Sequence, residues 1–319
     1  MKKILTSLLL FTAVMMSAQD VPASFPRKFL IEQISGDWCQ FCPGGMYAIA
    51  EHIEAASTPY IWLCCHSADE YATNKGNQVI SFANPNGGIP AMMLNRTKQS
   101  QGETFHPGYL PSMNIKDATT AEASVVIAHT YNAETRQLDV TVSGQVANAE
   151  VTEYLLSVVI KESGMVGSQS ESQGYSWKGK GWMEFVHPRV VRNYVSAALG
   201  DKVAVENQAY SKSYTFTLDE DWVAENCCVV AYITPTSKKP IINAEQAPVV
   251  AGTMGGEQYQ PMAVAENSAP NNNEQLTFDS VAVSKPSDDK LLVTLFSSKA
   301  IRSSVWGAMK QILTLEFNT

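Results

Sequence analysis

Hydrophobic and polar residues follow one pattern before residue 120 and another after it. In the first part, apolar runs at 28–31, 60–65 and 91–94 are separated by longer segments. A helix is predicted after the first run, because apolar residues recur there at helical spacing: Met46, Ile49, Ala50 and Ile53. Strand-like runs that alternate with a helical pattern are typical of α/β folds. We therefore predict an α/β domain at residues 20–120.

After residue 121, short strands follow one another with little predicted helix. The runs that predict them are 124–128, 138–142, 154–160, 214–218, 227–233 and 241–243. Residues 132–136 have the composition of a hairpin turn between the first two. Such a series is typical of two packed antiparallel sheets. We predict that residues 121–251 form an immunoglobulin-like β-sandwich.

A polar segment rich in glycine and serine interrupts this series at residues 163–181. It contains Trp177, and Trp182 follows it directly. The segment is too long for a tight turn. Two interpretations stay open: a functional loop that presents the aromatic rings, or aromatic side chains that pack back on the sheet.

The C-terminal part has a different character. Residues 252–275 lack any periodicity and are predicted to be a linker. Residues 276–319 are predicted to form a short β segment, with runs at 281–283 and 291–295 around a turn at 286–289, and with Gly307 beyond them. This segment is similar to the start of the C-terminal sorting domain of type IX secretion, although it is shorter. The alternative is a minor appendage of the sandwich.

The N-terminus carries an export signal. A basic start, an apolar stretch at 4–16 and small residues at 17–19 predict a signal peptide over residues 1–19. No later run of about twenty apolar residues occurs, so we expect a soluble or peripherally attached protein. The six cysteines would then meet an oxidising compartment. A formal net charge of −8 argues against a nucleic-acid partner, because binding phosphates requires clustered Lys and Arg.

Two cysteines, Cys39 and Cys42, lie two residues apart where the first strand gives way to the predicted helix. We expect Cys39 at or just before the helix N-terminus, where free amides and the helix dipole favour a thiolate and lower its pKa to roughly 7. Cys42, one turn inside the helix, would be the resolving thiol. Zinc sites of this spacing need a second ligand pair, and none occurs. We expect neither a cofactor nor a metal.

A proline downstream strengthens the redox interpretation. Ile89-Pro90 follows two glycines and precedes an apolar run, which predicts a cis peptide bond. Trp38-Cys39-x-x-Cys42 with such a proline about fifty residues later resembles the thioredoxin fold. That resemblance implies that Pro90 packs against the dithiol and helps to hold an extended substrate, so Cys39, Cys42 and Pro90 are the candidate catalytic residues. Thioredoxins have a buried carboxylate six residues before the first cysteine, whereas this chain has Gln33, which accepts no proton.

The strand at 60–65 ends in two adjacent cysteines, Cys64 and Cys65. Neighbouring side chains of a strand point to opposite faces, so these two are predicted to be buried and unbonded to each other. His66 and Asp69 follow at the C-terminal end of the strand, where sites in α/β sheets gather. His66 has either a chemical role or a capping role in the loop. A metal site using Cys39, Cys42, Cys64 or His66 is the least favoured alternative.

Several motifs together resemble one family. They are Trp38-Cys39-x-x-Cys42-Pro43, His66-Ser67-Ala68-Asp69, Gly88-Ile89-Pro90, Asn95-Arg96, 185–192, and 229–233 followed by 242–244. Over roughly residues 25–250 the chain is similar to the family of the 28-kilodalton outer membrane protein of Gram-negative anaerobes. The resemblance implies a thioredoxin-like domain followed by a β-sandwich in the cell envelope. It also implies that His187 and Arg192 join the sandwich to its neighbour.

Two functions are compatible with these features. The first is an envelope thiol–disulfide oxidoreductase, located in the periplasm or at the outer membrane, whose partners are protein thiols or disulfides. The second is a binding or structural envelope protein in which Cys39 and Cys42 form a static disulfide; Gln33 favours this alternative. The sequence indicates neither the oligomeric state nor the substrate.

Overall fold

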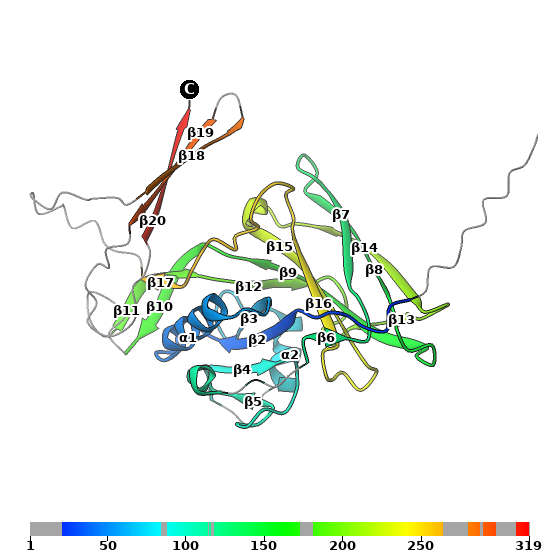
Figure 1. Ribbon diagram of the computed structural model, residues 1–319. Helices are drawn as coiled ribbons and strands as arrows, with labels where there is room; N and C mark the ends of the chain where they lie inside the picture. The colour runs from blue at the N-terminus through cyan, green and yellow to red at the C-terminus, as the bar shows by residue number, and fades with distance from the viewer. Residues whose placement is uncertain are drawn as a thin grey trace, which may run out of the picture. The chain divides into compact units, whose positions relative to one another are not determined.

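The computed structural model describes residues 21–83, 88–113, 115, 118–172, 181–263, 280–287, 290–297 and 311–318. The chain divides into two compact units, Met1–Ala265 and Glu266–Thr319. The signal-peptide prediction falls on residues outside the described ranges, as do Trp177 and Gly307. Figure 1 shows that the first unit is mainly β-structure, as the sequence pattern after residue 121 predicts.

The first part of the chain alternates strands and helices. Its elements are β1 (Phe25–Pro26), β2 (Phe29–Ser35), α1 (Cys42–Ala55), β3 (Tyr60–His66), α2 (Asn74–Ala83), β4 (Ala91–Leu94), β5 (Thr104–Phe105), η1 (Pro107–Ser112) and β6 (Thr120–Ala121). Strands β2 and β3 are parallel, whereas β4 is antiparallel to β2 and β5 to β4. Helix α2 was not predicted from the sequence, because its apolar positions are few: Val79 and Ala83 are the apolar side chains that it buries.

The second part of the chain is built from strands. They are β7 (Val126–Asn132), β8 (Gln137–Gln145), β9 (Glu153–Glu162), β10 (Met165–Glu171), β11 (Gly181–His187), β12 (Val190–Tyr194), β13 (Asp201–Ala204), β14 (Ala209–Thr217), β15 (Cys227–Thr234), β16 (Asn243–Pro248) and β17 (Met262–Ala263), with a short 3-10 helix η2 (Ala224–Asn226). The predicted turn at 132–136 is confirmed, and Asn132 Oδ1 accepts the N–H groups of Glu134 and Thr135 there.

One large sheet runs through both parts of the chain. Its order is β16-β15-β9-β12-β3-β2-β4-β5, and β13 pairs with β9 beside β12. Strand β12 connects the two parts, because Val190 pairs with Cys64 of β3 on one side and with Glu162 of β9 on the other. The predicted boundary near residue 120 therefore separates two sequence patterns that contribute to the same sheet. The division into domains at that residue stays a prediction.

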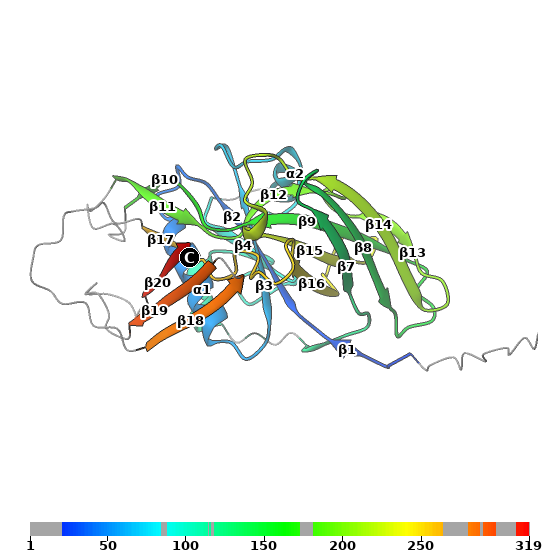
Figure 2. The same ribbon diagram turned by 90° about the horizontal axis from the view of Figure 1, so that it is seen from above.

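The two faces of this sheet are covered differently. Helix α2 covers one face of β2 and β3 and contributes Val79 to its core. Helix α1, η1 and the buried side chains of β11 cover the opposite face of the same strands. On that opposite side, β9 and β15 pack against a separate sheet of order β14-β8-β7, which Figure 2 shows as a layer of its own. The core between these sheets is made by side chains of β8, β9, β14 and β15.

The segment 163–181, for which the sequence left two interpretations open, includes strand β10 and leads into β11, and these two strands form a β-hairpin. Strand β10 pairs with β11, and β11 pairs in turn with β17. Met183 and Phe185 of β11 are buried against the α1 face of the large sheet. Trp182 does not pack back, since 60% of it is exposed.

The second unit contains an antiparallel sheet of three strands, β18 (Ser280–Ser287), β19 (Lys290–Ser297) and β20 (Gln311–Asn318). Strand β19 lies in the middle and pairs with the other two along its length. The two predicted runs at 281–283 and 291–295 fall within β18 and β19.

A buried ion pair in the first part of the chain is hydrogen-bonded to the second part. The guanidinium of Arg96 binds both carboxylate oxygens of Glu32 on β2, at 2.7 and 2.8 Å. It also donates to Tyr232 Oη on β15 at 3.0 Å and to the carbonyl of Lys238. Arg96 and Glu32 are 2% and 1% exposed. A buried pair of this kind stabilises a fold only while each charge keeps its partner.

We predict that Arg96→Met lowers the free energy of unfolding by about 3–5 kcal/mol, because it leaves the Glu32 carboxylate buried without a counter-charge. The double variant Arg96→Met with Glu32→Leu should recover most of this loss. Urea unfolding of both proteins measures the effect, and equal stabilities of the single variant and the wild type would contradict it.

Candidate functional site

The predicted dithiol lies in a tight loop between β2 and α1. Cys39 and Cys42 form a disulfide, with their Cα atoms 5.4 Å apart. The N–H of Cys39 donates to the carbonyl of Gly36, and the N–H of Cys42 donates to the carbonyl of Cys39, both at 3.1 Å. The prediction that Cys42 lies one turn inside the helix is wrong, because Cys42 is the first residue of α1. Pro43 explains this start, since proline has no N–H and suits the first helical positions.

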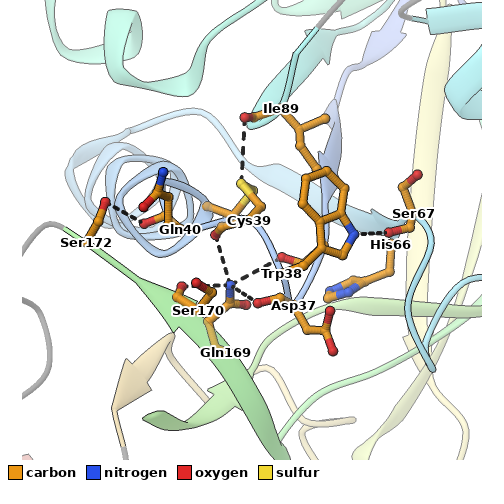
Figure 3. Close-up of a disulfide and its surroundings, with 12 residues drawn as sticks. Asp37, Trp38, Cys39, Gln40, His66, Ser67, Ile89, Gln169, Ser170 and Ser172 are labelled. Atoms are coloured by element: carbon orange, nitrogen blue, oxygen red, sulfur yellow. Dashed lines mark hydrogen bonds between the residues drawn. A yellow bond between two sulfur atoms is a disulfide. The ribbon is translucent and has the colours of Figure 1, made fainter. Parts of the chain in front are cut away.

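The third predicted residue lies directly beside the disulfide. The Ile89–Pro90 peptide bond is cis, as predicted. The carbonyl oxygen of Ile89 lies 3.6 Å from Cys39 Sγ, a contact visible in Figure 3. Gly45 of α1 faces the Pro90 ring so closely that a Cβ atom there would lie 2.9 Å from it. The structure therefore brings Cys39, Cys42 and Pro90 together, and Gly45 is a residue of this site that sequence reasoning missed.

The two cysteines differ in accessibility in the predicted direction, although both are buried. Cys39 is 4% exposed and Cys42 is 0% exposed. The aromatic neighbours Trp38 and Phe41 are each nearly half exposed. The indole N–H of Trp38 donates to the carbonyl of Ser67 at 2.8 Å, which orients the ring beside the loop (Figure 3).

A carboxylate fixes the loop from the side of β3. Asp69 accepts hydrogen bonds from the main-chain N–H of Asp37 at 2.8 Å, from His66 Nδ1 at 2.6 Å and from the N–H of Tyr71 at 3.0 Å. Burial acts to raise the pKa of Asp69, but the hydrogen bonds outweigh burial and hold this pKa below its ordinary value. For Asp37, burial and the nearby Asp69 charge raise the pKa. His66 is therefore the partner of a carboxylate that caps the loop.

His187 of β11 completes this polar region. It is fully buried, and its ring lies 5.4 Å from the ring of His66 and 4.9 Å from that of Tyr71. Burial, aided by His66, lowers the pKa of His187 to about 3. His187 thus joins the hairpin to the first part of the chain, as the family resemblance implies. Arg192 does not, because its ion pairs are with Glu162 and Asp221 of the second part.

We predict that His187→Phe reduces the loss of stability between pH 7 and pH 4 by about 3 kcal/mol. The unfolded chain takes up a proton at this residue below about pH 6.5, whereas the folded protein keeps His187 neutral down to about pH 3. Stability therefore falls as the pH drops through this window in the wild type. Urea unfolding at each pH measures the difference. The same replacement at half-buried His129 is the control, and equal pH dependence of the two variants would contradict the assignment.

Strand β10 contacts the loop from the opposite side. The main-chain N–H of Ser170 donates to the carbonyl of Asp37 at 2.6 Å, and that of Ser172 donates to the carbonyl of Gln40. The side-chain amide of Gln169 lies within hydrogen-bond distance of the carbonyls of Gly36, Asp37 and Cys39. Sequence reasoning missed these contacts. The polar segment around Gln169 has no apolar alternation that would have indicated a strand.

Gln33 occupies the position where thioredoxins have a carboxylate, and it is fully buried. Its Oε1 accepts the indole N–H of Trp62 at 3.0 Å. Cys64 lies directly opposite Gln33 in the parallel register of β2 and β3. Cys64 and Cys65 are both free and buried on opposite faces, as predicted. Burial raises the pKa of Cys65 to about 12 and that of Cys64 well above its ordinary value.

Two further features of the described residues bear on the alternatives considered above. Within the described ranges, no set of three or more His, Cys, Asp or Glu side chains is grouped so that it could hold a metal ion. In the same residues, no helix has both the length and the apolar character needed to cross a membrane.

Residues 80–252, more than half of the chain, match the family of outer membrane protein Omp28. The chain belongs to this family. It is therefore an exported protein associated with the outer membrane, as predicted. The matched range begins after Cys39 and Cys42, so the dithiol lies outside it. No curated protein matches the chain significantly.

Among solved structures, HBP35 of Porphyromonas gingivalis is similar in fold, with a TM-score of 0.61 and 18% sequence identity. The alignment covers 93% of this chain and 99% of HBP35. A crystallised domain of the outer membrane lipoprotein Omp28 from the same organism has a TM-score of 0.28 at 17% identity, covering 40% of this chain and 88% of that domain.

Proposed function

We propose that this protein exchanges thiols and disulfides with other proteins of the cell envelope. The observation that carries the proposal is the juxtaposition of the Cys39–Cys42 disulfide with Ile89-Pro90, where the Ile89 carbonyl lies 3.6 Å from Cys39 Sγ. The Ile89 carbonyl at this point suits the backbone of an extended peptide, whose N–H groups would pair beside the reactive sulfur. Exposed Trp38 and Phe41 supply apolar surface on the same loop.

The arrangement of the first part supports a thioredoxin-like domain. The strand order β3-β2-β4-β5, with β2 parallel to β3, places α1 on one face and α2 on the other. The second part supports an immunoglobulin-like sandwich, in which the sheet β14-β8-β7 packs on β9 and β15. In this proposal the first part carries the chemistry and the second part supports it.

The exchange has two steps that conserve atoms and electrons. In the reduced protein, the Cys39 thiolate attacks one sulfur of a partner disulfide, and the other partner sulfur leaves as a thiolate that takes up a proton. Cys42 then loses its proton and attacks Cys39 Sγ, which releases the second partner sulfur. The partner is reduced by two electrons, and the Cys39–Cys42 disulfide is restored. The reverse sequence oxidises a partner dithiol.

Cys39 is the proposed nucleophile because it is the less covered sulfur and precedes the first turn of α1. That turn contains no acidic residue, and the N-cap residue Phe41 makes no side-chain capping hydrogen bond within the described part of the chain. The positive end of the helix dipole therefore favours a thiolate at Cys39. Asp37 opposes this effect as an anion, so a moderate decrease of the Cys39 pKa is expected rather than an extreme one.

We predict that reduced Cys42→Ser reacts with iodoacetamide at Cys39 with a pKa below the ordinary thiol value of about 8.5. Reduced Cys39→Ser should label slowly at Cys42, because Cys42 is fully covered. Labelling rates against pH, followed by mass spectrometry, provide the measurement. Equal rates with an unshifted pKa at Cys39 would remove the proposed nucleophile.

A static disulfide is the second candidate function, and two observations favour it. Gln33 offers no carboxylate to accept the proton of Cys42, and both sulfur-bearing residues are at most 4% exposed. In that case the disulfide would brace the loop of a binding or structural envelope protein. The reduction potential separates the two functions, because exchange proteins lie above about −270 mV and structural disulfides below about −300 mV.

We expect the Cys39–Cys42 pair to equilibrate with glutathione or dithiothreitol at a potential above about −270 mV. We also expect Cys42→Ser, expressed in the envelope, to accumulate mixed disulfides through Cys39. Non-reducing gels followed by mass spectrometry of the trapped partners test this, with the double variant Cys39→Ser, Cys42→Ser as the control. A potential below about −300 mV together with no trapped partner would leave the static disulfide.

A further inference from the structure

The hairpin β10–β11 contacts the disulfide loop through main-chain and side-chain groups. Ser170 N–H and Ser172 N–H donate to the carbonyls of Asp37 and Gln40, at 2.6 and 3.2 Å. Ser170 donates from the edge of β10 that does not pair with β11, and Ser172 follows β10 directly. The loop therefore takes the place of a neighbouring strand beside β10, although it is separated from it by about 130 residues of sequence.

Gln169 is the central contact between the hairpin and the loop. It is fully buried, and its Nε2 lies 2.9 Å from Asp37 O, 3.1 Å from Cys39 O and 3.2 Å from Gly36 O. The carbonyl of its neighbour Ser170 lies 3.2 Å from the same nitrogen. Figure 3 shows the amide reaching the main chain of the loop from the side opposite to Ile89.

The nitrogen and the oxygen of the Gln169 amide have different surroundings, and the difference identifies the N–H groups as the ones that bind the loop. Its Nε2, with two N–H bonds, is surrounded by carbonyl oxygens, whereas its Oε1 is buried and has no hydrogen-bond partner among the residues that the structure describes. Burying an unpaired carbonyl oxygen is unfavourable. Position 169 therefore needs a side-chain hydrogen-bond donor, even though the acceptor of the same amide stays unpaired among the described residues. An acidic residue there would place negatively charged oxygens against the loop carbonyls.

We propose that Gln169, with the main-chain N–H groups of Ser170 and Ser172, is a latch that stabilises the disulfide form of Cys39–Cys42 over the dithiol form. Gln169 is a positioning residue in this proposal. It binds the carbonyl of Cys39 itself and those of Gly36 and Asp37 before it. The latch thereby lowers the reduction potential of the pair. Its role as a regulator of exchange rests on the proposed function.

The physical reason is that the latch contacts are made to the loop in its disulfide-bonded geometry. Reduction breaks the covalent bond and lets the two sulfur atoms move apart to van der Waals contact, so the intervening main chain adjusts. Hydrogen bonds to the carbonyls of that chain then lengthen or bend, and hydrogen bonds weaken steeply when they do. Interactions that are stronger in one state shift the equilibrium towards that state.

The same coupling acts in reverse. If the latch favours the disulfide, then reduction of the disulfide must loosen the latch by the same factor. Strand β10 would be held on its outer edge in the oxidised protein and released there in the reduced protein. The hydrogen bonding of the outer edge of β10 therefore depends on whether the Cys39–Cys42 bond is oxidised or reduced, although that bond is itself almost inaccessible to solvent.

The test uses the full chain and the variants Gln169→Leu and Gln169→Glu, with Ser168→Ala as the control on the exposed side of the same strand. Leucine removes the donor without adding charge, and glutamate also adds repulsion. The equilibrium constant of the Cys39–Cys42 pair is measured in glutathione or dithiothreitol buffers. We expect Gln169→Leu to shift it about tenfold towards the dithiol, a rise in potential of about 30 mV, and Gln169→Glu to shift it further.

A change of less than twofold in folded Gln169→Leu, or an equal change in Ser168→Ala, would overturn the proposal. If the Gln169 variants do not fold, hydrogen exchange of the wild-type protein tests the proposal instead. The amide hydrogens of Ser170 and Ser172 should exchange at least tenfold faster after reduction, and equal exchange would overturn the latch. The outcome is independent of partner trapping, because a static disulfide would still change its potential when the latch is removed.

Discussion

The arrangement of this molecule depends on the main-chain hydrogen bonds that β12 makes along both of its edges. Val190 pairs with β3 on one side and β9 on the other, which closes an edge that would otherwise leave buried polar groups unpaired. Two residues, Pro188 and Arg189, separate β12 from β11. Once β12 is in the sheet, the hairpin has little freedom in where it lies. Its position over the disulfide loop is therefore a consequence of sheet completion.

The features that the sequence predicts correctly are those that depend on residues close together in the chain. The helix after Cys42, the cis bond at Ile89-Pro90 and the turn after Asn132 each arise from a few neighbouring residues, and the structure agrees with them. Gln169 shows why the rest was missed. Its contacts connect segments far apart in the chain, and its sequence neighbours are mostly serines and other polar residues without a periodic apolar face. The shared sheet was missed for a related reason, because strand order follows from pairing across the fold and not from local pattern.

Three buried polar atoms of the first unit stand out because they lack partners within the part of the chain that the structure describes. Gln33 Nε2, His66 Nε2 and Gln169 Oε1 are buried without hydrogen-bond partners among the described residues. Native proteins contain few such atoms, and they concentrate where chemistry or strain requires them. A buried N–H donor beside a sulfur favours the thiolate, whereas a buried oxygen acceptor disfavours it.

The four free cysteines give the chain a particular difficulty during export. Cys64, Cys65, Cys227 and Cys228 are all buried in the folded protein, where burial raises their pKa values. In an unfolded chain crossing into an oxidising compartment, all six thiols are open to oxidants, and fifteen complete pairings are possible. The thiols of adjacent cysteines on one strand are shielded from oxidants only after both faces of that strand have been covered. Correct maturation therefore requires the large sheet to form before oxidation is complete, and chaperones that delay oxidation would raise the yield of native protein.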